Sequence, residues 1–185
     1  MVRDTRHSHL IDTLCVLVDS GVQFVVAGGA AMLLYGIKRL TLDLDIAVAS
    51  DQSNLWRFIS TLRDLKFTPR VPLPAETILN SDLVERLVVE KRAMVFSFWC
   101  AEAPYTQIDM FLTRENSFDH LVSDARTVNV SGRAVLVASR IKLIEMKCSV
   151  KPIRDKDLSD IMALQRIDQK HQRTGSEVES VVPVA

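Results

Sequence analysis

The chain has 185 residues, of which 48% are hydrophobic and 25% are charged, a composition that is ordinary for a globular domain with its own core. Its 23 basic and 23 acidic residues cancel to a formal net charge of zero. This balance argues against a protein that coats nucleic acid through a basic surface, although local recognition of one nucleic-acid end stays open.

The chain shows neither a signal-peptide pattern nor a membrane-spanning run. The longest apolar stretch, 24–34, is interrupted by glycines and is too short to cross a bilayer. The three cysteines and four histidines have no zinc-ligand spacing. We therefore expect a cytoplasmic protein without a membrane partner, whose cysteines are buried free thiols.

The first part of the chain predicts alternating helices and strands. Apolar residues recur at helical spacing over 9–20, and the β-branched run 22–27 predicts a buried strand that ends at Gly28-Gly29. A short helix is expected over 30–35. Segment 41–48 then alternates polar and apolar residues as a strand does.

The remaining pattern predicts one domain over 1–168, with a core at 22–137, a C-terminal helical part at 138–168 and a flexible tail at 169–185. In chain order we expect a helix at 51–65 capped by Ser50 or Asp51, a loop around Pro69, Pro72 and Pro74, a short helix at 82–87, strands at 92–99 and 106–112 separated by a turn at Pro104, a hairpin of 128–130 with 134–137, and helices at 139–148 and 155–167.

Asp43-Leu44-Asp45 is the most informative segment. Residues two apart in a strand share a face, so both carboxylates would project together, roughly 6–7 Å apart along the backbone. A shared divalent cation would offset their repulsion. Solvation at a strand end, or pairing with Lys38 and Arg39, is the alternative.

Asp109 repeats this geometry between Ile108 and Met110 on a later strand. By itself it would be an ordinary solvent-facing acid, but with Asp43 and Asp45 it becomes a third oxygen ligand of the kind magnesium prefers. Gly28-Gly29, between a strand and a helix, would let backbone N–H groups approach a phosphate, and a plain turn is the alternative. The segment fits neither the Walker loop nor the Rossmann glycine pattern.

Together these features resemble the DNA polymerase-β-like nucleotidyltransferase superfamily. Its signature is Gly-Gly/Ser, a helix-length gap, Asp-x-Asp/Glu and a later strand carboxylate; here thirteen residues separate Gly28-Gly29 from Asp43-Leu44-Asp45. The resemblance implies an α/β (α+β) fold, with a mixed sheet flanked by helices and followed by C-terminal helices. It also implies that Asp43, Asp45 and Asp109 hold two Mg²⁺ ions, while Gly28-Gly29 binds the phosphates of a nucleoside triphosphate.

The C-terminal part resembles the bacterial AbiEii toxin-like type, in which a helix lysine precedes an Arg/Lys-x-Lys-Asp-Leu-x-Asp segment. Here these are Lys147 and 154–160, and the resemblance covers about 22–164. It implies that Lys147 and Asp157 line the nucleotide site, with Lys147 countering charge in the transition state, and that Arg154 and Lys156 meet phosphates. A solvated helix surface is the alternative for these residues, and Asp160 is expected to cap a helix or pair with a cation.

The resemblance implies an Mg²⁺-dependent nucleotidyltransferase that moves a nucleoside monophosphate onto an acceptor hydroxyl. The acceptor stays open among tRNA, protein and small molecules. A toxin of a toxin–antitoxin system is one role, and it would need an antitoxin partner. The alternatives are a non-catalytic nucleotide-binding or regulatory module that retains the fold, against which the presence of all three acids argues, and an unrelated α/β protein with surface acids.

Overall fold

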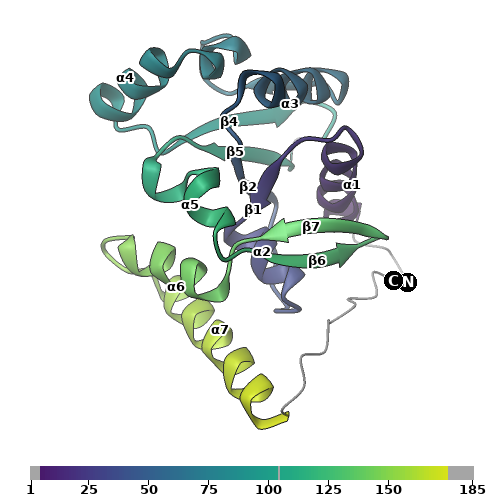
Figure 1. Ribbon diagram of the computed structural model, residues 1–185, viewed down its shortest axis with the longest axis vertical. Coiled ribbons are helices and arrows are strands. Elements are labelled where there is room, and N and C mark those ends of the chain that lie inside the picture. The colour runs from purple at the N-terminus through teal and green to yellow at the C-terminus, as the bar shows by residue number, and fades with distance from the viewer. Residues whose placement is uncertain (1–4, 104, 175–185) are drawn as a thin grey trace.

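One β-sheet organises the computed structural model, which describes residues 5–103 and 105–174 (Figure 1). The helices are α1 (Thr5–Asp19), α2 (Gly28–Leu34), α3 (Gln52–Asp64), α4 (Ser81–Lys91), α5 (Phe118–Val122), α6 (Arg140–Ser149) and α7 (Asp155–Thr174), with 3₁₀ turns η1 (Ala75–Leu79) and η2 (Arg114–Asn116). The strands are β1 (Phe24–Val26), β2 (Asp43–Val48), β3 (Phe67–Pro69), β4 (Val95–Cys100), β5 (Gln107–Phe111), β6 (Arg126–Val130) and β7 (Arg133–Val137).

The seven strands pair in the order β3-β4-β5-β2-β1-β7-β6. β2 runs parallel to β5 and β1 runs parallel to β7, whereas the other neighbours are antiparallel. The expected fold class, a mixed sheet flanked by helices and followed by C-terminal helices, is therefore confirmed. The Asp-Leu-Asp strand, β2, lies inside the sheet between β5 and β1.

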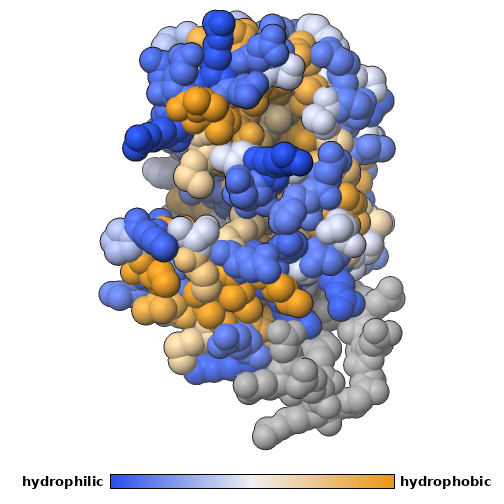
Figure 2. Space-filling model, turned by 60° about the vertical axis from the view of Figure 1, so that its left-hand side comes forward, coloured by the Kyte–Doolittle hydropathy of each residue, from blue (hydrophilic) through white to orange (hydrophobic). Residues whose placement is uncertain are grey.

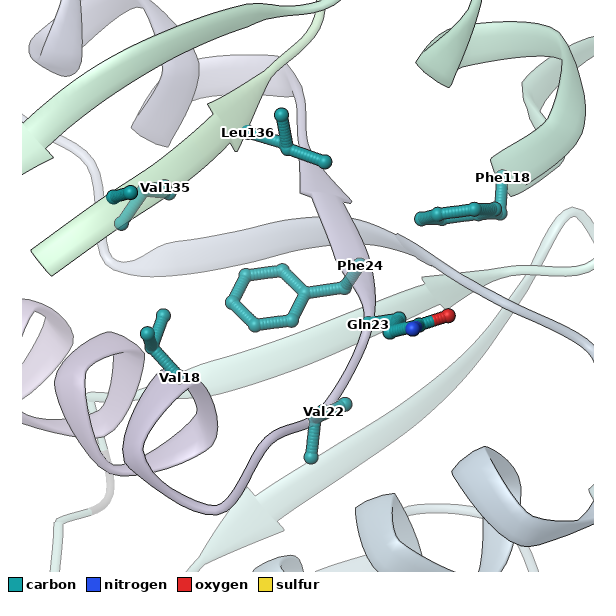
Figure 3. A pocket seen from close by; sticks show the side chains of 8 residues that line it. Val18, Val22, Gln23, Phe24, Phe118, Val135 and Leu136 are labelled. Carbon is teal, nitrogen blue, oxygen red and sulfur yellow. The ribbon is translucent and has the colours of Figure 1, made fainter.

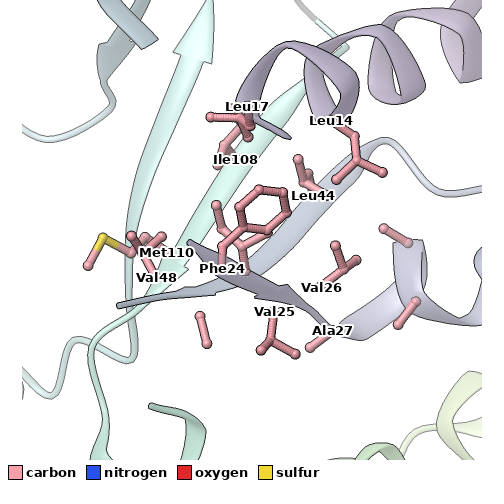
Figure 4. Close-up of a cluster of buried hydrophobic side chains, with 14 of the residues drawn as sticks. Leu14, Leu17, Phe24, Val25, Val26, Ala27, Leu44, Val48, Ile108 and Met110 are labelled. Atoms are coloured by element: carbon pink, nitrogen blue, oxygen red, sulfur yellow. The ribbon is translucent and has the colours of Figure 1, made fainter. Parts of the chain in front are cut away.

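Helices α1 and α3 cover one face of the sheet. Leu14 of α1 lies on the same side as Leu44 and Ile108 (Figure 4), and the Phe58 ring of α3 meets Phe98 edge-on at 5.7 Å. All five side chains are fully buried, and burying one such side chain contributes about 1.5–3 kcal/mol. Because strand side chains alternate, the residues beside Leu44 and Ile108 project from the opposite face.

Most expected elements are present with shifted ends. Asp51 caps α3 by accepting a hydrogen bond from the Asn54 N–H at 2.9 Å, and the β6–β7 hairpin turns at Ser131-Gly132. The helix expected from residue 30 begins instead at Gly28. α7 continues to Thr174, past the expected end at residue 167.

Three expectations were wrong. The proline-marked loop contains β3, which pairs with β4 at the sheet edge, where Pro69 is tolerated. α4 begins at Ser81, where the Asn80 side chain accepts from two backbone N–H groups, and it runs on to Lys91, past the expected end at residue 87. Cys100 is buried as expected, but Cys148 is exposed. The turn at Pro104 and residues 175–185 of the expected tail lie outside the described residues.

The surface is divided between polar and apolar regions. Figure 2 shows hydrophilic residues across the middle of one face and an apolar patch in its lower part, where α6 and α7 lie. These two helices leave Ile141, Leu158 and Met162 exposed. Among the described residues, no helix is both long and apolar enough to cross a membrane.

Candidate active site

Three carboxylates meet on the sheet face that α1 and α3 leave open. Asp45 of β2 is the direct register partner of Asp109 of β5, and Asp43 lies two residues before Asp45 on the same face. Neighbouring strands are about 4.8 Å apart, so the side chains of register partners lie close together. The structure thus brings together the three acids that were predicted to bind metal.

Asp45 is the most perturbed of the three acids. Burial is the main cause that raises the pKa of its carboxyl group to about 6, and the neighbouring charge of Asp109 adds to the shift. The backbone N–H of Gly29 and the charge of Lys147 act in the opposite direction. The predicted site residues Gly29 and Lys147 are therefore close enough to Asp45 to influence its ionisation.

Asp43 lies at the exposed start of β2. Partial burial and the charge of Asp109 raise the pKa of its carboxyl group, whereas the charges of Arg70 and Lys156 lower it. In addition to burial, the charge of Asp109 raises the pKa of both Asp43 and Asp45, so the three acids repel one another and a bound cation would offset that repulsion.

The Gly28-Gly29 pair lets the start of α2 approach the carboxylates. Gly28 has a φ of +57°, and a Cβ atom there would collide with the carboxylate of Asp45. A Cβ atom at Gly29 would lie 2.6 Å from the hydroxyl oxygen of Thr41. Ala27 gives α2 no side-chain cap, so the Asp45 carboxylate takes that place by accepting from Gly29. This packing explains both glycines, and their contact with phosphate stays a prediction.

Lys147 belongs to a buried ion-pair cluster that joins α6, α7 and the segment before β2. Its ammonium lies 2.6 Å from Asp160 and 3.8 Å from Asp157. Asp160 also pairs with Arg39, so its expected pairing with a cation is confirmed. Arg39, one of the two cations considered as partners for the aspartates of β2, thus pairs with Asp160 of α7.

Asp157 is only 2% exposed. Its carboxylate accepts from Nε of Arg154 at 2.6 Å, and this hydrogen bond is the main reason that its pKa is lowered. Asp157 therefore contacts Lys147 and Arg154 and helps to hold both side chains in place. A direct contact of Asp157 with nucleotide stays a prediction.

Two residues near the carboxylates were missed by the sequence analysis. The side-chain amide of Gln107 donates to both carboxylate oxygens of Asp109, at 2.8 and 2.9 Å, and Arg70 donates to the Gln107 side-chain oxygen. Gln107 could have been found from the sequence, since it lies two residues before Asp109 on a predicted strand and so shares a face with it. No feature of the sequence placed Arg70 near the carboxylates, because it follows β3, which was expected to be part of a loop.

The sequence matches no protein-family model and none of the curated proteins. Solved structures do resemble it. The lincosamide antibiotic adenylyltransferase LnuA, bound to lincomycin, is 15% identical with a TM-score of 0.56, over 90% of this chain and 98% of that one. ANT(2″)-Ia in complex with adenylyl-2″-tobramycin is 12% identical with a TM-score of 0.59, over 91% and 94%. A nucleotidyltransferase-like protein from Paracoccidioides brasiliensis is 14% identical with a TM-score of 0.54, over 90% and 78%.

The chain has the nucleotidyltransferase fold. The superfamily-level resemblance is thus supported at the level of the fold, and the AbiEii-like type stays a prediction. These neighbours match over 90% or more of this chain.

The donor set fits the divalent cations that were predicted for a nucleotidyltransferase. Asp43, Asp45 and Asp109 offer only carboxylate oxygens, which magnesium prefers. Within 5–103 and 105–174, no three acidic, histidine or cysteine side chains are already arranged as a metal site. Magnesium commonly keeps waters and substrate phosphates among its ligands, so the three acids fit a site that the nucleotide completes.

A separate pocket of about 330 Å³ lies at the end of β1 that is away from Gly28 (Figure 3). Val18, Phe24, Phe118 and Leu136 contribute to its wall, and Gln23 is its polar side chain. No ionisable side chain lines it. The pocket therefore offers no side chain for acid–base chemistry, and the three carboxylates remain the candidate active site.

Proposed function

We propose that the protein transfers a nucleoside monophosphate from a nucleoside triphosphate to the hydroxyl of an acceptor. The observation that carries this proposal is the register pairing of Asp45 with Asp109, beside Asp43, Gly28 and Lys147, in a nucleotidyltransferase fold. The convergence of three acids on one sheet face favours an enzyme over a non-catalytic module.

In the proposed reaction the acceptor oxygen attacks the α-phosphorus, the bond to the bridging oxygen breaks and pyrophosphate leaves. Asp43, Asp45 and Asp109 would hold two Mg²⁺ ions, which when bound neutralise the triphosphate and lower the pKa of the attacking hydroxyl. Asp109 takes the hydroxyl proton. Lys147 adds positive charge beside Asp45, where negative charge develops on the phosphates.

A small molecule is the acceptor class that we propose first. LnuA and ANT(2″)-Ia were solved with lincomycin and adenylyl-2″-tobramycin, and this chain covers 98% and 94% of those proteins. The balanced charge of the chain also gives no general attraction to nucleic acid. A tRNA acceptor and a toxin role with an antitoxin partner stay predictions from the AbiEii resemblance, and a protein acceptor stays a prediction from the wider superfamily.

The test is calorimetric titration of ATP, GTP, CTP and UTP into the wild type and into Asp43→Ala/Asp45→Ala, each with Mg²⁺ and with EDTA. We expect Mg²⁺-dependent binding of at least one nucleotide by the wild type and at least a tenfold loss of affinity in the double variant. Circular dichroism would check that the variant remains folded.

The nucleotide that binds is then used as an α-³²P-labelled donor with pools of hydroxylated small molecules, with tRNA and with cell protein. Label that moves to a small molecule supports the first choice of acceptor. Label on tRNA or protein replaces that choice. No binding of any nucleotide, or equal binding by the double variant, would remove the proposed site.

A further inference from the structure

We propose that Gln107 is a positioning residue that fixes the carboxylate of Asp109, and that Arg70 fixes Gln107. The inference rests on the proposed function, in which Asp109 binds metal and takes a proton and must therefore be held in one orientation. The contacts among the three side chains are observed whatever the function is.

Gln107 of β5 lies next to Asp109 on its own strand and next to Asp43 on the neighbouring strand β2. It shares a face of β5 with Asp109, two residues away, and its register partner on β2 is Asp43. Its amide nitrogen is nearly equidistant from the two Asp109 oxygens, at 2.8 and 2.9 Å. A hydrogen bond to both oxygens restricts rotation of the carboxylate, which a single contact would leave free to turn.

Arg70 determines which end of the Gln107 side chain faces Asp109. A guanidinium group only donates hydrogen bonds, so the group that faces Arg70 must be the side-chain oxygen of Gln107. The amide nitrogen is then turned toward Asp109. Arg70 is itself anchored, because its backbone N–H donates to the carbonyl oxygen of Ser97 at 2.9 Å, and Ser97 is the β4 register partner of Asp109.

This arrangement leaves Asp109 able to act on another group. A carboxylate has about four lone-pair sites, and the Gln107 contact uses one direction on each oxygen. The remaining sites can bind a cation or accept a proton. Partners that orient a metal ligand in this way typically change metal affinity by 10–100-fold when they are removed.

The test compares Gln107→Leu with Gln52→Leu. Gln52 is a matched control because its amide also makes a hydrogen bond, to the Leu79 carbonyl oxygen at 2.9 Å, at an exposed site away from the carboxylates. Crystal structures of the metal-free wild type and both variants would show the orientation of Asp109. Titration with Mn²⁺ alone, with free ion followed by electron paramagnetic resonance, would measure metal affinity, with Asp109→Ala as the reference for complete loss.

We expect Gln107→Leu to turn or disorder the Asp109 carboxylate and to weaken Mn²⁺ binding by at least tenfold, while Gln52→Leu changes neither. In the crystal structures, Arg70→Met should release the Gln107 amide and turn the Asp109 carboxylate, and it should add little displacement in the Gln107→Leu background, because Arg70 acts on Asp109 through Gln107. The crystal structures are the readout for this variant, since Arg70→Met also removes a positive charge that acts on Asp43. An unmoved Asp109 in Gln107→Leu, or an Mn²⁺ affinity equal to that of the wild type, would overturn the inference. A wild type that binds no Mn²⁺ by itself would agree with a metal site that the nucleotide completes, and the crystal structures would then decide the positioning role.

Discussion

At the scale of single residues, the carboxylate of Asp45 lies against the first turn of α2, where Gly28 leaves room for it and Gly29 donates to it. Gly28 has no Cβ atom and adopts a positive φ, so two separate properties of glycine are used at one position. A substitution that isolates these two properties would show which one the site requires.

Gly28→Ala should therefore lower the unfolding free energy by more than the cost of backbone strain, because its Cβ atom would also displace the Asp45 carboxylate. Gly36 is a matched control, because it has a φ of +78° and has no neighbour within 4 Å of the place a Cβ would take. We expect Gly36→Ala to lose about 1–2 kcal/mol of unfolding free energy in urea denaturation from strain alone. Gly28→Ala should lose more, and only it should abolish Mg²⁺-dependent nucleotide binding in calorimetry. Equal effects of the two substitutions would show that Asp45 moves aside freely.

Asp45→Asn should stabilise the metal-free protein at neutral pH. The pKa of Asp45 is raised from 3.8 to about 6, chiefly by burial, so the folded state loses stability as pH rises through that interval. The shift corresponds to about 3 kcal/mol. An asparagine has the same shape and carries no charge.

Urea denaturation in EDTA would measure this effect. We expect Asp45→Asn to exceed the wild type by up to about 3 kcal/mol at pH 7.5 and to match it near pH 4, where both side chains are neutral in the folded state. Added Mg²⁺ should raise the stability of the wild type more than that of the variant. A variant less stable than the wild type at pH 7.5 would contradict the burial argument.

At the scale of elements, Asp160 of α7 connects three parts of the chain. It pairs with Lys147 of α6 and with Arg39, which precedes β2, and its side chain is 11% exposed. Removing one member of a buried ion pair leaves the other charges uncompensated. The cluster thus joins the helical hairpin, which carries Lys147, to the sheet that carries the aspartates.

We expect Asp160→Asn to lower the unfolding free energy by about 3–5 kcal/mol. Glu102→Gln is the control, because Glu102 pairs with Lys66 at 2.6 Å but the two side chains are 68% and 66% exposed. An exposed pair of this kind contributes about 0–1 kcal/mol. Urea denaturation of both variants would measure the difference. Similar small losses in both would mean that the cluster is as well solvated as the surface pair.

The elements also show which parts of the fold and of the candidate site could be predicted from the sequence. Alternation around Asp43, Asp45 and Asp109 predicted two strands and a shared face, because strand periodicity is a local property. β3 and Arg70 were not predictable in the same way, since β3 exists only through its pairing with β4. The approach of Gly28 to Asp45 likewise depends on α2 lying across β2, and the glycine pair alone does not encode that contact.

At the scale of the whole molecule, the sheet separates the two tryptophans of the chain. Trp99 of β4 is 41% exposed between the buried Phe98 and Cys100, and its register partner on β5 is Gln107. It therefore lies on the carboxylate face. Trp56 is 46% exposed on α3, which covers the opposite face.

This division predicts which tryptophan senses a ligand. In Trp56→Phe, the remaining Trp99 should change its fluorescence when Mn²⁺ or a nucleotide with Mg²⁺ binds, because binding alters the environment next to Gln107. In Trp99→Phe, the remaining Trp56 should not respond. The two variants remove one partly exposed indole each, so they serve as controls for one another, and Asp45→Asn in the Trp56→Phe background should remove the response. A signal from Trp56 instead would mean that the ligand binds on the α1–α3 face, which carries none of the three aspartates.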